Sequence, residues 1–349
     1  MDQSLLCDEV WPSSPLATAM NYMIDCGTLS IYARSKDDYD ESFTICLEKE
    51  MSYMPQPNYV ENLCSNHLVI ARFKSIQWFI QSRSRLNLSL GTVFYAANYL
   101  DRFISMNHCN PWKYWMVELL SIACLSIASK FNDTCSPTLL EIQREDLDYS
   151  FDSITIQRME IMVLEALGWR IASTTAYSYL ELLLSLINLD SRSFKPQIQE
   201  QLIAKFNNLL LGAISDSKLL EFRPSVVAIS ALSCSLDKSI ISSTASDTYL
   251  ACATSLLDNN QKAELVKCQK LMEAQSVADD CFYNLLAHRV FHFCPSSPTT
   301  VLLKERINFS HYHVDFSLFK MRAQRMDTAE STARICRKRK REEEEEDFT

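Results

Sequence analysis

Apolar side chains recur at spacings of three and four residues from about residue 41 to the 280s, and this period constrains the fold most. Between residues 89 and 107 they form one stripe on an amphipathic helix. Residues 111–130 leave few polar faces and predict a more buried helix, for which Pro111 suits the start because a first-turn N–H has no partner to lose. Strand alternation is scarce, so the sequence predicts an all-α fold.

The pattern divides the chain into four parts. Residues 1–37 show no sustained period and are expected to form a flexible arm. About ten helices in the middle fit two compact domains, which we place at 38–170 and 171–290. Further helices are expected at 66–82, 154–167, 174–187, 196–213, 224–237, 244–257 and 262–287. Residues 291–349 form a polar, flexible tail that ends in a basic and then an acidic run.

The composition excludes several kinds of site. The chain has only 4 glycines, widely spread, whereas a phosphate loop or dinucleotide fingerprint needs several close together. The 13 cysteines include no CxxC pair, which argues against zinc ribbons and thioredoxin-type motifs. His288 and His292 stand four apart near Cys281 and Cys294, a spacing that we interpret as incidental. We therefore expect no cofactor, no metal and no catalytic residues.

Charge and hydropathy bear on the partners. The net charge of −9 argues against nonspecific affinity for nucleic acid, because that binding depends on Lys and Arg neutralising phosphates. The first residues lack the basic segment and apolar run of a secretory signal. No stretch approaches the roughly 20 apolar residues that span a bilayer, so no membrane partner is expected. These features predict a nuclear or cytoplasmic protein whose cysteines are reduced thiols.

Several segments carry a resemblance to a known family. Four segments resemble successive helices of a cyclin box: ARFKSIQWFI (71–80), NYLDRFIS (98–105), WMVELLSIACLSIASKF (115–131) and TIQRMEIMVLEALGWR (155–170). Three further segments are similar to stretches of plant D-type cyclins: SPTLLEIQ (136–143), LEFRPSVVAISAL (220–232) and SPTTVL (297–302). The resemblance implies two tandem five-helix cyclin-box domains. It also implies a non-catalytic regulatory subunit that seats the αC helix of a cyclin-dependent kinase and so activates it.

The resemblance carries the kinase-binding positions of the family onto four residues. Lys130 and Glu160 match the contact positions, where two charges at the rim of a hydrophobic groove hydrogen-bond the kinase helix. Leu119 matches a core position that helps to shape the groove, and Phe131 lies at its lip. A Lys near a helix C-terminus and a Glu on a helix are also common for structural reasons alone, so this alternative stays open.

Arg72 and Asp101 match a family pair that bridges the first two helices. The resemblance implies a partly buried ion pair, and losing one partner should cost about 3–5 kcal/mol. Asn132 is a departure: the family has two acids after the residue that follows Lys130, and this chain has Asn132 and Asp133. This departure keeps open an inactive cyclin-like scaffold. Residues 71–78 match a substrate-docking patch of some cyclins but support an apolar docking site only weakly.

Leu5, Cys7 and Glu9 form an LxCxE motif in the N-terminal arm. In an extended peptide these residues project to one face, where Leu and Cys can fill apolar pockets while Glu accepts hydrogen bonds. D-type cyclins are similar here and use the element to dock retinoblastoma-type pocket proteins. The expected partners are therefore a cyclin-dependent kinase and a retinoblastoma-related protein, with a kinase inhibitor protein as a further candidate.

The basic run near the C-terminus suits a nuclear import signal, and it comprises Arg337, Lys338, Arg339, Lys340 and Arg341. A solvated charged tail is the alternative interpretation. The basic run predicts a nuclear protein, also present in the cytoplasm, and the resemblance to D-type cyclins implies that it promotes entry into the cell cycle at G1/S. The rivals are the inactive scaffold and a cyclin-fold transcription factor, which would need a basic face.

Overall fold

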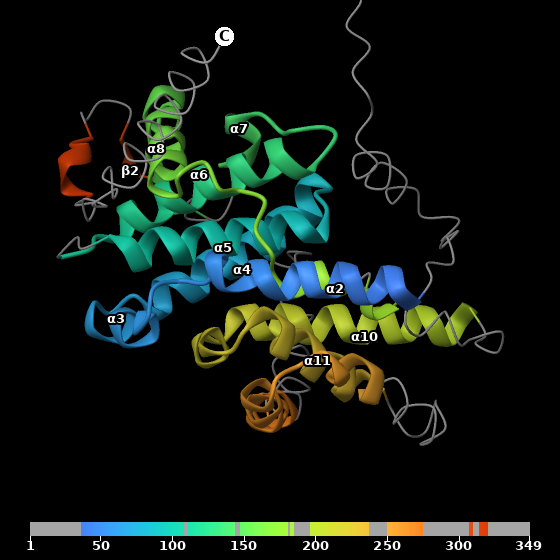
Figure 1. Cartoon of the computed structure of the whole chain (residues 1–349). Coiled ribbons are helices and arrows are strands. Elements are labelled where there is room, and N and C mark those ends of the chain that lie inside the picture. The colour runs from blue at the N-terminus through green and yellow to red at the C-terminus, as the bar shows by residue number, and fades with distance from the viewer. Residues whose placement is uncertain are drawn as a thin grey trace, which may run out of the picture.

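The computed structural model describes residues 36–107, 111–143, 147–180, 182–184, 196–236, 250–274, 307–309 and 314–319. These residues are almost wholly helical, which confirms the all-α prediction (Figure 1). The strands within them are two residues long, β1 (Tyr149–Ser150) and β2 (Ile307–Asn308), and they pair in parallel. Within the described residues the predicted helices are largely present, whereas residues 244–249 and 275–287 of the last two lie outside them. The domain boundaries given above stay predictions.

The first helical group has five helices around one apolar core. They are α4 (Val69–Leu86), α5 (Leu90–Met106), α6 (Tyr114–Asn132), α7 (Leu139–Ile142) and α8 (Ser153–Ala166). The side chains of α6 from Leu119 to Leu125 are all buried, so α6 is the central element of the group. Each fully buried Leu or Ile contributes about 1.5–3 kcal/mol relative to exposure, which makes this core the main source of the group's stability.

Polar side chains set where these helices begin. Ser89 caps α5 by accepting a hydrogen bond from the Thr92 N–H, and Asp152 caps α8 by accepting one from the Thr155 N–H at 2.9 Å. The turn after α8 contains Gly168 with φ 60°, a left-handed conformation that glycine adopts without steric cost. The start of α8 is therefore fixed by its cap, and its end by this turn.

Helix α6 corrects one prediction. By length and composition α6 is apolar enough to cross a membrane, contrary to the expectation that no stretch approaches that length. Most of its apolar window is buried inside the protein, however, where α5 and α8 pack on it. Its apolar character is accounted for by this central position in the core.

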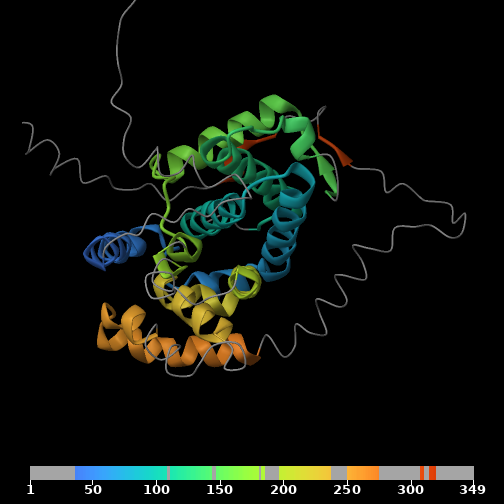
Figure 2. The same ribbon diagram turned by 90° about the vertical axis from the view of Figure 1, so that its right-hand side faces the viewer.

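The second helical group surrounds a separate apolar core. It contains η2 (Ala176–Tyr179) with the helical residues 182–184, α10 (Pro196–Ser215), η3 (Ser217–Glu221) and α11 (Pro224–Ser235). Residues 250–255 and 259–274 are also helical. Figure 2 shows this group beneath the first one, with the 259–274 region on its outer side. Pro224 occupies the first turn of α11, where no N–H donor is lost.

Three elements precede the first group: α2 (Lys36–Glu50), η1 (Met51–Tyr53) and α3 (Tyr59–Ser65). Helix α2 packs against η2 and α11, and its buried Phe43 belongs to the second core. Glu50 at the end of α2 is fully buried. Its carboxylate accepts hydrogen bonds from the Tyr179 hydroxyl at 2.8 Å and from the Ser225 N–H and hydroxyl, both at 2.9 Å. The helix before the first group is thus tied to the second.

Replacing Glu50 by glutamine tests this connection through pH. Burial raises the pKa of Glu50 above its usual value, although the hydrogen bonds from Ser225 and Tyr179 oppose the shift. A folded-state pKa above the unfolded one contributes stability that is present below the unfolded pKa and lost as pH rises through the folded pKa. The stability of the wild type relative to Glu50→Gln should therefore fall as the pH rises above the usual pKa of a glutamate, about 4.3. Urea unfolding at several pH values measures this difference, and an increase with pH would contradict the account.

Candidate functional site

Lys130 and Glu160 lie next to each other on the first helical group. Lys130 lies in the last turn of α6, and Glu160 lies in the middle of α8. The Lys130 Nζ donates to both carboxylate oxygens of Glu160, at 2.7 and 2.8 Å. The structure thus brings together two residues that are 30 positions apart in the sequence. An ammonium has three N–H donors, so one remains for a further acceptor.

The exposure of the pair bears on its role. The Lys130 side chain is 48% exposed and that of Glu160 is 10% exposed, so the pair sits where the surface meets the core. A pair with one half-exposed partner is screened by water and contributes only about 0–1 kcal/mol to stability. Its geometry is nevertheless fixed by two hydrogen bonds. The pair is therefore better suited to presenting charges at a surface than to stabilising the fold.

Phe131 supplies an apolar surface beside this pair. Its side chain is 43% exposed, and its ring packs edge-to-face on Tyr95 at a centroid distance of 5.6 Å. Tyr95 stacks in turn on Tyr99 at 6.2 Å, and the Tyr99 hydroxyl donates to the Ile171 carbonyl at 2.7 Å. Burial raises the pKa of Tyr99, so its hydroxyl keeps its proton and this bond. The exposed ring is therefore held by a rigid aromatic stack.

Leu119, which the resemblance places at a core position that helps to shape the groove, lies inside the first core. Its side chain is fully buried in the core, so it has no surface through which to touch a partner. Its contribution is to position α6 from within. Two isoleucines of α8, Ile154 and Ile161, are exposed instead, and Ile161 follows Glu160 directly. The sequence pattern did not single them out, because exposure on a helix face is settled by what packs around it.

Arg72 and Asp101 form a buried network between α4 and α5. The Arg72 guanidinium donates to the Asp101 carboxylate through Nε at 2.7 Å and Nη2 at 2.9 Å. The Tyr59 hydroxyl also donates to Asp101 at 2.7 Å. Burial, and then the Asp101 charge, raise the pKa of Tyr59 well above its usual value, so this donor stays protonated. The pair is more deeply buried than the sequence indicated, with side-chain exposures of 1% and 5%.

Asn132 has an internal role in the structure. Its Nδ2 donates to the hydroxyl oxygens of Ser89 and Thr92, the latter at 3.0 Å. The neighbouring Asp133 accepts from the Ser89 N–H at 2.8 Å and from the Thr92 hydroxyl at 2.6 Å. The end of α6 thus binds the start of α5. At residue 132 an amide supplies donors that a second carboxylate would lack.

A groove of about 720 Å³ lies between α4 and α6. It is lined by Ala71, Phe73, Lys74, Ser75, Gln77, Trp78, Gln81, Tyr114, Val117, Glu118, Ser121, Leu147, Asp148 and Tyr149. It includes residues 71–78, where the sequence supports an apolar docking site only weakly. Polar side chains stand among the apolar ones along the groove. The Glu118 carboxylate accepts from the backbone N–H groups of Asp148 and Tyr149, which fixes one wall.

Several predicted residues lie outside the described ranges. They are Leu5, Cys7 and Glu9 of the LxCxE motif, the basic run 337–341, and the 281–294 region with its two histidines. Within the described part of the chain, no group of three or more His, Cys, Asp or Glu side chains is placed to hold a metal ion. The motif and the basic run remain predictions.

Sequence reasoning missed three features that the structure places near these residues. Glu50 joins α2 to the second group, and Tyr95 supports Phe131. The C-terminal aromatic residues Phe309, Phe316 and Phe319 lie on the first group. The contact between Tyr95 and Tyr99 could have been predicted, because residues four apart lie on the same face of a helix. Glu50 and the C-terminal aromatics gave no local signal, since their partners are far away in the sequence.

Comparison with known proteins identifies the class. The cyclin N-terminal domain family matches residues 41–172, which span the first helical group and the Lys130–Glu160 pair. A solved viral cyclin from herpesvirus saimiri has the same fold, with a TM-score of 0.50 at 14% sequence identity. It covers 69% of this chain and 98% of its own. Cyclins are regulatory subunits of cyclin-dependent kinases and are not catalysts themselves.

Comparison with curated relatives shows which kind of cyclin this chain resembles. Cyclin-D2-2 of Oryza sativa subsp. japonica is 30% identical over 269 residues, covering 76% of this chain and 71% of its own length. Cyclin-D3-3 of Arabidopsis thaliana is 36% identical over 191 residues, covering 55% of this chain and 50% of its own length. The chain therefore belongs to the cyclin family, as a plant D-type cyclin. For several other relatives that it matches, the chain spans about half to less than two thirds of their length.

Proposed function

We propose that this chain binds a cyclin-dependent kinase through the surface around Lys130, Glu160 and Phe131, activates it, and directs it to a retinoblastoma-related protein at the G1/S transition. The observation that carries the proposal is the bidentate Lys130–Glu160 pair beside an exposed aromatic ring. The position of the pair between α6 and α8 supports it, because both helices belong to the matched cyclin domain.

The surface has the chemistry that an amphipathic kinase helix needs. Phe131 and Ile161 offer apolar area, and the ion pair offers one cation and one anion in a fixed geometry. Charges arranged in this way set the register and choice of a partner more than they add affinity. Seating the kinase αC helix lets the Lys–Glu ion pair of the kinase form, which phosphoryl transfer requires.

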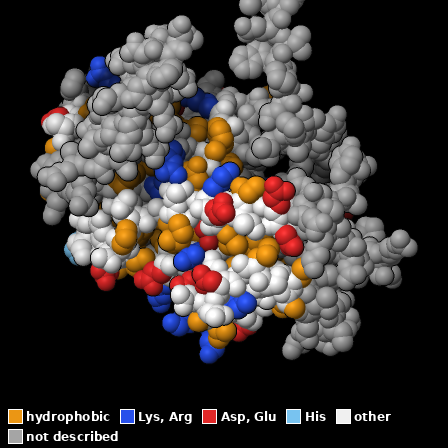
Figure 3. Space-filling view, in the orientation of Figure 1, with side chains coloured by type: hydrophobic (Ala, Val, Ile, Leu, Met, Phe, Trp, Pro, Cys, Tyr) orange, Lys and Arg blue, Asp and Glu red, His pale blue; other side chains and the backbone are white. Residues whose placement is uncertain are grey.

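The pocket-protein and nuclear parts of the proposal rest on the sequence. Leu5, Cys7 and Glu9 have the spacing that projects all three side chains to one face of an extended peptide. The basic run 337–341 suits nuclear import. On the face shown in Figure 3, the described Lys and Arg side chains are interspersed with acidic and apolar ones. That mixture, with the net charge of −9, favours a protein partner over DNA.

A kinase assay tests the proposal. The purified chain is mixed with a cyclin-dependent kinase, and phosphorylation of a retinoblastoma-related fragment is compared with that of a short peptide substrate. The double substitution Lys130→Ala/Glu160→Ala should lower stimulation on both substrates at least about tenfold, because charge-assisted hydrogen bonds to the kinase are lost. Cys7→Ala should lower it only on the fragment, because that substitution affects substrate docking alone.

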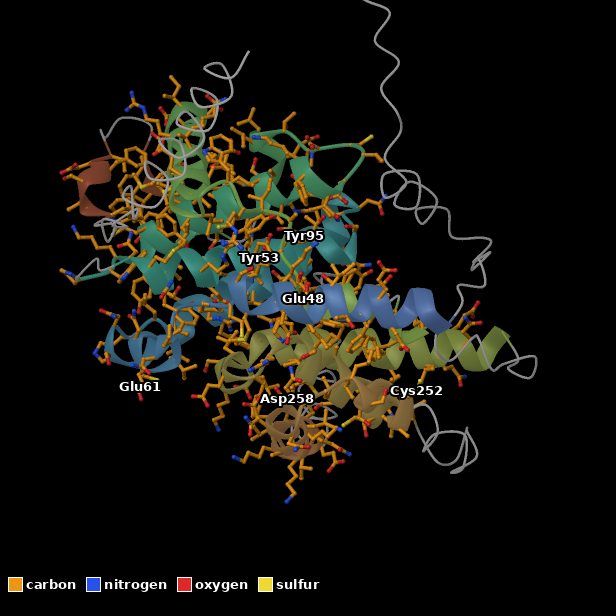
Figure 4. All side chains as sticks on the ribbon, in the orientation of Figure 1. Glu48, Tyr53, Glu61, Tyr95, Cys252 and Asp258 are labelled. Atoms are coloured by element: carbon orange, nitrogen blue, oxygen red, sulfur yellow. The ribbon has the colours of Figure 1, made fainter. Side chains whose placement is uncertain are left out.

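A matched control removes one negative and one positive charge at positions away from the proposed kinase-binding surface. Glu61 lies on α3, well away from Tyr95 and the neighbouring Phe131, as Figure 4 shows for Glu61 and Tyr95. Lys262 is an exposed residue of the helix 259–274. Glu61→Ala/Lys262→Ala should leave stimulation unchanged. If the wild type stimulates no kinase but still binds the pocket protein, the inactive scaffold is the correct alternative. Salt-sensitive binding of DNA would instead favour a transcription factor.

A further inference from the structure

Two pieces of the C-terminal region lie against the first helical group. Residues 307–309 and 314–319 stand beside α8 in both views (Figures 1 and 2). The Ile307 N–H donates to the Asp148 carbonyl at 3.0 Å, and the Phe309 N–H donates to the Ser150 carbonyl at 2.9 Å. This is a parallel strand addition between segments that are more than 150 residues apart in the sequence. Part of the region predicted as a polar tail thus contacts the cyclin box.

Aromatic side chains of the first group receive these pieces. They are Phe103, Trp112, Trp115, Tyr149 and Phe151, which we call the aromatic groove. The Phe309 ring lies 5.4 Å from Trp115 and 5.5 Å from both Tyr149 and Phe151. The Phe319 ring lies 6.1 Å from Trp112 and 6.2 Å from both Phe103 and Trp115. These distances are typical of favourable aromatic pairs.

Only some side chains of the two C-terminal pieces are buried against the first group. Val314 and Phe319 are buried in the first core and Phe309 packs against it, while Ile307 and Leu318 are exposed. Within the second piece, Asp315 caps the short helix η4 (Phe316–Leu318) by accepting a hydrogen bond from the Ser317 N–H at 2.9 Å. Main-chain pairing combined with pockets for selected side chains is how sheet edges recognise extended peptides.

We propose that the aromatic groove is a peptide-binding site and that residues 307–309 and 314–319 of the same chain are its ligand. The ligand is recognised by backbone pairing to Tyr149 and Ser150 and by the side chains of Phe309, Val314 and Phe319. The contact surface is of the kind that binds a free peptide, so docking does not require the covalent connection. The site adjoins α8, because Phe316 lines a pocket with Ile154, Ile161 and Met162.

Cleavage of the full chain tests this proposal. A protease recognition sequence is inserted between Pro298 and Thr299, and the purified protein is cut and passed through a size-exclusion column. The C-terminal fragment should elute with the body of the protein. Phe309→Ala/Phe319→Ala should release it, because losing two largely buried Phe side chains weakens binding at least about 100-fold. A synthetic peptide covering residues 304–321 should displace the wild-type fragment.

The matched control is Ile307→Ala/Leu318→Ala, which removes apolar side chains from exposed positions of the same segment. Its fragment should stay bound like that of the wild type. Separation of the wild-type fragment after cleavage would overturn the proposal. Retention of the Phe309→Ala/Phe319→Ala fragment would also overturn it, since another part of the C-terminal region would then hold the contact. None of these outcomes depends on a kinase, so they are independent of the proposed function.

Discussion

Replacing Asp101 by alanine is expected to lower the free energy of unfolding by about 3–5 kcal/mol. The substitution leaves the Arg72 guanidinium buried without its anionic partner, and Arg72 is only 1% exposed. It also removes the acceptor of the Tyr59 hydroxyl, a second buried donor. A buried cation without its counter-ion is far more costly than the loss of the attraction itself.

Urea unfolding of the purified chain, followed by far-UV circular dichroism, measures the effect. Glu61→Ala is the control, because an exposed carboxylate should change the stability by no more than about 0.5 kcal/mol. The triple substitution Tyr59→Phe/Arg72→Met/Asp101→Leu replaces the whole network by apolar side chains and should cost less than Asp101→Ala alone. If the triple variant were the less stable one, the attraction within the network would outweigh the cost of burying it.

The sequence determines most of this fold because the helices carry their own signals. The spacing of apolar residues in 89–107 predicts α5, and the apolar run 111–130 predicts α6. The absence of polar faces on α6 also indicates its central position. Helix α2 was not separated from its surroundings, because its apolar stripe is weak and its anchor is Glu50. That residue bonds to Ser225, 175 positions away, and no local pattern encodes such a contact.

The candidate kinase-binding site is less predictable from the sequence than the helices are. Lys130 and Glu160 were found through family motifs, and nothing in the residues themselves predicts that they meet across two helices. Which side chains reach the surface depends on packing. Leu119 and Ile161 show this, because both are apolar helix residues and only Ile161 is exposed. The internal role of Asn132 depends on Ser89 and Thr92, which become neighbours only after α5 and α6 have packed together.

Exchanging the charges of Lys130 and Glu160 is expected to separate the structural from the functional role of the pair. Lys130→Glu and Glu160→Lys each place like charges at the former 2.7 Å contact and should lower the thermal midpoint. The double exchange restores opposite charges, so its midpoint should return close to that of the wild type. A double-mutant cycle of this kind isolates the pairwise interaction.

Kinase binding should not recover in the double exchange. In the proposed complex, the surface then presents an anion at residue 130, where the kinase helix would meet a cation, and a cation at residue 160, where it would meet an anion. Each charge-assisted hydrogen bond is worth about 1.5–3 kcal/mol, so two mismatches should weaken binding at least about 100-fold. Titration calorimetry with a cyclin-dependent kinase and thermal unfolding of the same samples give both values. Recovery of kinase affinity together with the thermal midpoint would mean that the pair acts only within the fold, and that the kinase reads the neighbouring apolar surface of Phe131 and Ile161.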